Sequence, residues 1–222
     1  MAKKFIDIKG IDLDNFIKTV KGEEQFKFVI NELVRNKKTN TEGFTVLDAK
    51  KLQSTDGDVN YLTASLENDK ARITFIKTAR QTIVGLRVLQ EENGVTVAKM
   101  YHLMDGRLQH KGDVDYDKLL EGIKQLEQSE LPDNLDRSEV AANIPCIYGN
   151  WCGPGCSGPG APISPVDTCC KAHDNCYASR GYFACSCDSN LLYCLWPYVL
   201  QGSEWAILVY TYFSGAPCNP FA

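Results

Sequence analysis

Most residues that could do chemistry lie in one short stretch, between positions 167 and 188. If residues 167–177 are helical, Cys169, His173 and Cys176 fall on one face, and Asp174 lies on the adjacent face. A histidine beside carboxylates can act as a general base, because one carboxylate fixes the ring while the free ring nitrogen takes a proton from water. This stretch therefore predicts proton-transfer chemistry centred on His173.

The cysteine spacing indicates how a second helix brings Asp188 close to this histidine. In a pair of antiparallel helices, the numbers of facing residues add to a constant. Cys169 with Cys194 and Cys176 with Cys187 satisfy the same constant, so both pairs could form disulfides without strain. The same register places Asp188 within a turn of His173. An imidazole and two carboxylates, those of Asp174 and Asp188, thus share one neighbourhood.

A short loop, Cys152-Gly-Pro-Gly155, supplies groups of another kind. Glycine lets the backbone turn its carbonyl oxygens inward, and oxygen atoms are the ligands that Ca²⁺ takes. The carboxylate that does not orient the histidine is free for such a hard cation. Zinc is disfavoured, because two C-x₂-C pairs are absent. No serine stands at a recognisable nucleophile elbow, which favours activated water over an acyl-enzyme.

Composition divides the chain into two unlike parts. All 10 cysteines lie after residue 140, and residues 141–222 hold only two basic and four acidic residues. This cysteine density is typical of disulfide-stapled secreted domains, so we expect a secreted or otherwise extracytoplasmic protein. We recognise no signal peptide and no transmembrane stretch, which leaves the export route open. The net charge of −4 gives no reason to expect a nucleic-acid partner.

Residues 1–130 are predicted to form an α+β domain of unknown function, an antiparallel meander with two helices. The helices are indicated by apolar periodicity around Phe26–Val34 and at 115–129. His102 and His110 stand alone, without a cluster of catalytic residue types. Segments rich in β-branched and aromatic residues predict strands near 44–52, 59–66, 71–78, 82–90 and 94–103.

A polar linker is predicted at 131–145, followed by the cysteine-rich domain at 146–222. Because the front domain lacks cysteine, it folds regardless of redox state, unlike the second domain. We hypothesise that it is a prodomain that restrains the second domain through intramolecular contact, or accompanies it to a membrane, until the linker is cut. The competing hypothesis is a binding or targeting domain that stays attached.

Three runs of the second domain resemble the secreted phospholipase A2 family, and most of all its insect-venom-type branch. They are Trp151-Cys-Gly-Pro-Gly155, Asp167-Thr-Cys-Cys-Lys-Ala-His-Asp-Asn-Cys-Tyr177 and Cys185-Ser-Cys-Asp188. The resemblance covers residues 146–218 and implies a small, mainly α domain stapled by disulfides. The segment Ser157–Pro165 departs from the family pattern.

The resemblance implies a role for each matching residue. His173 would be the general base, Asp188 would orient it, and Tyr177 would hydrogen-bond to Asp188. Asp174 and the carbonyl groups of Trp151, Gly153 and Gly155 would bind calcium. The implied disulfides are Cys152–Cys170, Cys169–Cys194, Cys176–Cys187 and Cys185–Cys218, which leaves Cys146 and Cys156 to pair by elimination.

The expected activity is calcium-dependent hydrolysis of the sn-2 acyl ester of phospholipids at a membrane surface. The alternative is a non-enzymatic, disulfide-rich toxin or bacteriocin-like peptide that is released from a leader and disrupts membranes. The aromatic tail is expected to pack in the core, and one or two of its residues could form a lipid-facing rim. The tail comprises Tyr193, Trp196, Tyr198, Trp205, Tyr210, Tyr212 and Phe213.

Overall fold

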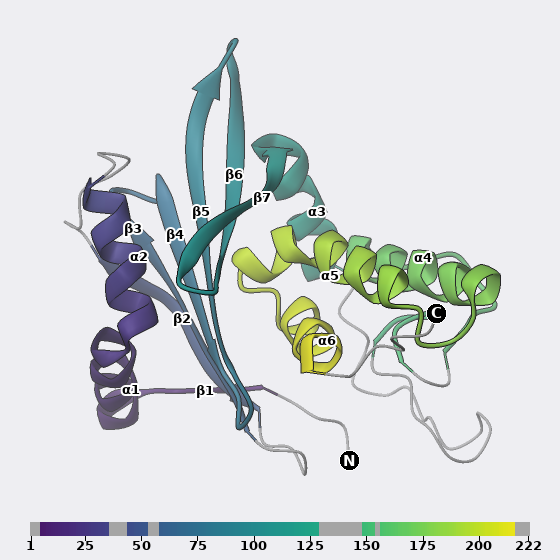
Figure 1. The fold of residues 1–222 in the computed structure, drawn as a ribbon, viewed down its shortest axis with the longest axis horizontal. Coiled ribbons are helices and arrows are strands. Elements are labelled where there is room, and N and C mark those ends of the chain that lie inside the picture. The colour runs from purple at the N-terminus through teal and green to yellow at the C-terminus, as the bar shows by residue number, and fades with distance from the viewer. Residues whose placement is uncertain (1–4, 36–43, 53–57, 129–147, 154–155, 216–222) are drawn as a thin grey trace. The chain divides into compact units, whose positions relative to one another are not determined.

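The computed structural model describes residues 5–35, 44–52, 58–128, 148–153 and 156–215 (Figure 1). Its contacts divide the chain into two compact units. The first comprises residues 1–117 and 200–202, and the second comprises residues 118–199 and 203–222. The predicted linker at 131–145 lies outside the described residues, so the domain boundary stays a prediction.

The first unit contains a seven-stranded antiparallel sheet in which every strand pairs with its neighbour in the sequence. This is the predicted meander. Tight turns with left-handed residues, such as Asn93-Gly94, form three of the connections between successive strands in the described residues. The strands are β1 (Ile6–Asp7), β2 (Thr45–Leu52), β3 (Val59–Leu66), β4 (Ala71–Lys77), β5 (Thr82–Glu92), β6 (Val95–Met104) and β7 (Arg107–Asp115).

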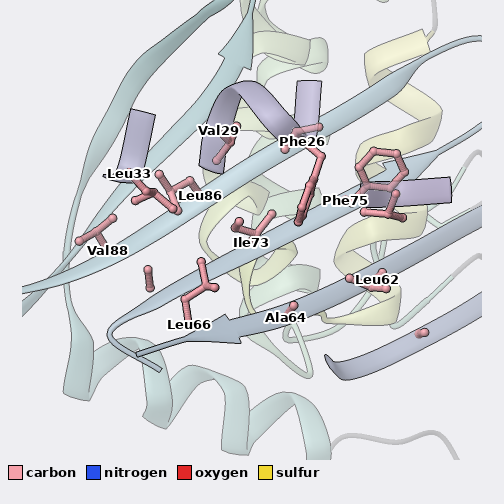
Figure 2. Close-up of a cluster of buried hydrophobic side chains, with 14 residues drawn as sticks. Phe26, Val29, Leu33, Leu62, Ala64, Leu66, Ile73, Phe75, Leu86 and Val88 are labelled. Atoms are coloured by element: carbon pink, nitrogen blue, oxygen red, sulfur yellow. The ribbon is translucent and has the colours of Figure 1, made fainter. Parts of the chain in front are cut away.

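Two helices, α1 (Gly10–Gly22) and α2 (Glu24–Arg35), pack their apolar sides on one face of this sheet. Figure 2 shows Phe26, Val29 and Leu33 above alternate residues of the strands, as the two-residue period of a strand requires. Phe75 and Ile73 at the centre are fully buried. The first unit therefore has a hydrophobic core of its own.

Sequence patterns located most of this unit, and the longer elements that they missed are α1 and β7. The five predicted strands match β2 to β6, and the predicted helix at Phe26–Val34 matches α2. Helix α1 was not predicted, although Leu13, Phe16, Ile17 and Val20 have helical spacing. Strand β7 was not predicted either, because it is mostly polar and lies at the edge of the sheet.

The second unit is mainly helical. It contains most of α3 (Tyr116–Gln128), together with α4 (Pro165–Arg180), α5 (Cys185–Leu200) and α6 (Glu204–Gly215). The sequence pattern assigned the helix at 115–129 to the front domain, whereas the contacts group residues 118–128 with the second unit. Among the described helices, none combines the length and apolar character that crossing a membrane requires.

Candidate active site

Helices α4 and α5 form the frame of the site. Helix α4 begins after Ser164, whose side chain accepts a hydrogen bond from the backbone N–H of Asp167, and Pro165 occupies its first turn. Disulfides Cys169–Cys194 and Cys176–Cys187 hold α4 against α5, with Cα separations of 5.8 and 5.7 Å. The antiparallel register predicted from the cysteine spacing is thus confirmed.

His173 and Asp188 face each other across this seam. Nε2 of His173 lies 2.8 Å from Oδ1 of Asp188, and the hydroxyl of Tyr177 donates to the same oxygen at 2.5 Å. Because a carboxylate only accepts hydrogen bonds, this contact assigns the proton to Nε2. Nδ1 lies on the side of Asp174, 3.8 Å from its Oδ1. The neutral ring therefore keeps Nδ1 free to accept a proton.

The surroundings of His173 make it a stronger base than a free histidine. Burial disfavours the protonated ring, but the carboxylates of Asp174 and Asp188 stabilise that ring more strongly, and the pKa of His173 is raised. Burial and the hydrogen bond to Asp188 raise the pKa of Tyr177, which keeps its hydroxyl protonated as a donor. The ring of Phe213 packs edge-on against the ring of His173, with 4.8 Å between the two ring centroids.

The loop before α4 approaches the same place. Trp151 and Gly153 line one cavity together with His173 and Asp174. Disulfide Cys152–Cys170 ties the loop to α4, with a Cα separation of 5.1 Å. Gly153 has a φ of +130°, a conformation that favours glycine. Gly155, the third loop residue that was predicted as a calcium ligand, lies outside the described residues.

Asp174 fits a role as a ligand of a hard cation. Its Oδ2 is buried and makes no hydrogen bond to any residue that the structure describes. A buried carboxylate oxygen without a partner is costly unless a cation or water occupies its free side. The described residues contain no group of three or more His, Cys, Asp or Glu side chains that could hold a metal. A cation beside Asp174 would therefore depend on main-chain oxygens such as those of the loop.

The cavity at this site has a volume of about 790 Å³, and its wall combines the polar groups with apolar side chains. From the sequence, Tyr212 and Phe213 were predicted only as members of an aromatic tail, and no role was predicted for the aromatic pair Tyr182-Phe183 between α4 and α5. The sequence signal for this pair was a glycine, Gly181, followed by two aromatic residues directly after a helix. The apolar part of the wall includes Tyr182, Phe183, Leu191, Val209, Tyr212 and Phe213.

The remaining predictions for this unit have mixed outcomes. Trp196 and Tyr210 are buried, as predicted for core residues, whereas Tyr193 and Tyr212 are 61% and 53% exposed. Cys156 and Cys185 are disulfide-bonded. Their predicted partners, Cys146 and Cys218, lie outside the described residues, so these two pairings stay predictions.

Comparisons with known proteins identify relatives for the C-terminal part only. No family model matches the chain, and no solved structure matches it. The acidic phospholipase A2 homolog taipoxin gamma chain of Oxyuranus scutellatus scutellatus is 39% identical over 82 residues, which are 31% of this chain and 52% of the relative. Acidic phospholipase A2 S17-58 of Austrelaps superbus is 56% identical over 50 residues, 19% of this chain and 32% of the relative.

A basic phospholipase A2 of Naja nigricollis is 40% identical over 52 residues, 23% of this chain and 34% of the relative. The chain thus spans about half the length of the first of these relatives and about a third of the other two. The narrower resemblance to the insect-venom-type branch stays a prediction. The C-terminal part of this chain is therefore similar to phospholipases A2 over stretches of about 50 to 80 residues.

Proposed function

We propose that the second unit hydrolyses the sn-2 acyl ester of glycerophospholipids, with calcium as its cofactor. The observation that carries this proposal is the contact of Nε2 of His173 with Asp188, which leaves Nδ1 free beside Asp174 in a cavity of about 790 Å³. The similarity to phospholipases A2 supports the same class of reaction.

In the proposed reaction, Nδ1 of His173 takes a proton from a water molecule whose oxygen attacks the ester carbonyl carbon. Asp188 stabilises the resulting imidazolium and, with Tyr177, keeps the ring in place. The bond between the carbonyl carbon and the sn-2 oxygen breaks, and His173 returns its proton to that oxygen. The products are a fatty acid and a lysophospholipid.

The ligands that we propose for calcium are the carboxylate of Asp174 and the main-chain carbonyls of Trp151, Gly153 and Gly155. A bound calcium ion would supply positive charge for the oxygen that becomes negative during the attack. The buried, unpartnered Oδ2 of Asp174 supports this assignment. The apolar wall around Leu191 and Val209 suits an acyl chain.

A labelled substrate tests the proposed reaction. The full-length protein is incubated with phospholipid vesicles that carry one isotope in the sn-1 chain and another in the sn-2 chain. The proposal predicts free fatty acid from the sn-2 position only, with the sn-1 label retained in lysophospholipid. Release of the sn-1 chain, or of both chains equally, would contradict it.

One observation favours a second candidate function. The first relative described above is named a phospholipase A2 homolog, so the unit could act on membranes without hydrolysis. The two functions differ in their response to calcium removal. A chelator stops a calcium-dependent hydrolase, whereas leakage of dye from vesicles caused by membrane disruption alone would continue.

We also propose an extracellular site of action, which disulfides Cys152–Cys170, Cys169–Cys194 and Cys176–Cys187 support. The phospholipid membrane surface is the proposed partner. For residues 1–130 we propose the role of a prodomain, which rests on the absence of cysteine from that part and on its different composition.

A further inference from the structure

Asp167 is a buried charged residue that the proposed chemistry does not use. It lies in the first turn of α4, and its exposed fraction is 0%. Its oxygens accept three hydrogen bonds from the main chain. Oδ1 accepts from the N–H of Trp151 at 2.8 Å, while Oδ2 accepts from those of Asn150 at 3.1 Å and Ile163 at 3.0 Å.

These hydrogen bonds explain how a carboxylate can be buried at this place. A carboxylate removed from water is costly unless its charge is compensated, and hydrogen bonds from N–H groups to an ionised acceptor are among the stronger ones. Because two of the three donors belong to Asn150 and Trp151, Asp167 joins α4 to the loop that carries the proposed calcium ligands.

Gly149 shows how closely the loop approaches this carboxylate. A Cβ atom at Gly149 would lie 2.4 Å from Cγ and Oδ1 of Asp167, far inside contact distance. The φ of Gly149 is +62°, a left-handed conformation. Any larger residue there would push the loop and the carboxylate apart.

The segment that departs from the family pattern, Ser157–Pro165, holds the same loop from another side. The side-chain amide of Asn150 donates to the carbonyl of Ala161 at 2.8 Å. The indole N–H of Trp151 donates to the carbonyl of Gly160 at 3.0 Å. Both the main chain and the side chains of these two loop residues are therefore fixed.

We propose that Asp167 is a positioning residue for the calcium site, which holds loop Gly149–Gly153 in the conformation that binds the ion. Its carboxylate is directed at main-chain N–H groups, so it acts through the loop. The inference rests on the proposed function, because it assumes calcium ligands at Trp151 and Gly153. Residues of this kind, which support metal ligands without touching the metal, often change metal affinity by about 10- to 100-fold.

The test is calcium titration of the full-length protein by calorimetry, which does not depend on activity. Asp167→Asn keeps the shape of the side chain but replaces one accepting oxygen with an NH₂ group, which cannot accept a hydrogen bond. We expect the calcium dissociation constant to rise about tenfold or more. Activity should return when calcium is raised to saturation, because His173 and Asp188 are unchanged.

Ser164→Ala is the matched control. It removes the hydrogen bond that the Ser164 side chain accepts at the same end of α4 but leaves the three hydrogen bonds that the Asp167 carboxylate accepts in place. It should lower the melting temperature without changing calcium affinity. Gly149→Ala disturbs the contact between Gly149 and Asp167 from the loop side, so it should also lower calcium affinity. If Asp167→Asn does not fold, this second variant tests the inference.

The outcomes separate the inference from the proposed function. If the wild-type protein binds no calcium, the proposed function itself fails and the inference falls with it. If the wild-type protein binds calcium, and Asp167→Asn or Gly149→Ala binds it equally well, only the inference is overturned. A loss of affinity that Ser164→Ala matches would also overturn it, because the effect would then come from helix stability.

Discussion

His173 has two ring nitrogens in different surroundings, and this difference underlies the proposed chemistry. Nε2 is engaged by Asp188 at 2.8 Å, whereas Nδ1 lies 3.8 Å from Asp174. The hydroxyl of Tyr177 donates a second hydrogen bond to Asp188 and holds its carboxylate in place. That carboxylate in turn holds the ring of His173. Two aspartates near one imidazole can therefore do different work, one as an orienting group and one as a cation ligand.

The first prediction concerns the general base. His173→Ala should lower phospholipid hydrolysis by about 10²- to 10⁴-fold, because the described residues offer no second histidine near the cavity. His110→Ala is the control, since His110 is half exposed and belongs to the first unit. Circular dichroism checks that both variants fold. Near-normal turnover by His173→Ala would remove this residue from the mechanism.

The second prediction concerns Asp174. Asp174→Lys should lose both calcium binding and activity, because an ammonium group would replace the carboxylate where the cation must lie. Glu121→Lys makes the same change of charge at an exposed position of α3 and should change neither. Calorimetry measures the calcium affinity of both variants. Unchanged affinity in Asp174→Lys would show that the ligand assignment is wrong.

Individual residues of the site were predictable to different degrees. His173 and Asp188 followed from helical spacing and from the cysteine register, both of which are local properties of the sequence. The role of Asp167 did not follow, because its donors lie at Asn150, Trp151 and Ile163, and only the folded chain brings them together. The contact of Phe213 with His173 was unpredictable for the same reason.

At the scale of elements, the two disulfides between α4 and α5 replace much of the core that a small helical pair would need. The connection between these helices is short and exposes an aromatic pair. Tyr182 is 74% exposed and Phe183 is 60% exposed, and both line the cavity. Phe183 has a φ of +65°, an uncommon conformation for a bulky residue.

The third prediction assigns this aromatic pair to membrane contact. Aromatic side chains partition into the interface of a bilayer. Replacing both Tyr182 and Phe183 with serine should weaken binding to phospholipid vesicles about tenfold or more. Hydrolysis of a short-chain, monomeric phospholipid should change much less, because His173 and Asp188 are untouched.

Tyr193→Ser provides the matched control for this loop. Tyr193 is 61% exposed but does not line the cavity. Vesicle sedimentation measures binding of both variants. Equal vesicle binding by the wild-type protein and the loop variant, or an equal loss in Tyr193→Ser, would contradict the assignment.

Elements were predictable where their sequence pattern was strong. Strands β2 to β6 alternate or are rich in β-branched residues, and clear turn signals separate most of them. Strand β7 has no buried residue and is mostly polar, so its position depends on pairing with β6 and not on its own sequence. Helix α6 is apolar along most of its length, so its sequence shows no alternation of apolar and polar faces that would indicate a helix. Helix α2 has a clear amphipathic pattern, and that pattern predicted its position.

At the scale of the whole molecule, the chain joins two units of different chemistry. The first is rich in charged residues and built on a sheet, and the second is held by disulfides and carries the candidate site. Composition indicates two unlike parts, because cysteine content changes abruptly near residue 140, and this boundary stays a prediction. The function of the first unit was not predictable, since it contains no recognisable catalytic or binding motif.

The fourth prediction follows from the proposed prodomain. A recognition site for a specific protease is placed within 131–145, and the purified protein is cut there. Lipid hydrolysis should rise clearly after cleavage, because the restraint by the first unit is then removed. The same protein without the recognition site, treated with the same protease, is the control. Identical rates before and after cleavage would rule out the prodomain in favour of an attached binding or targeting domain.

The central claim is that His173 and calcium together hydrolyse phospholipids. The most direct measurement is fatty-acid release from mixed phospholipid vesicles by the wild-type protein and by His173→Ala, each intact and cleaved within 131–145, with calcium or with a chelator. We predict release by the wild-type protein in calcium, none with the chelator, and almost none from His173→Ala. Absence of release from both wild-type forms, or release that persists in the chelator or in His173→Ala, would contradict the claim.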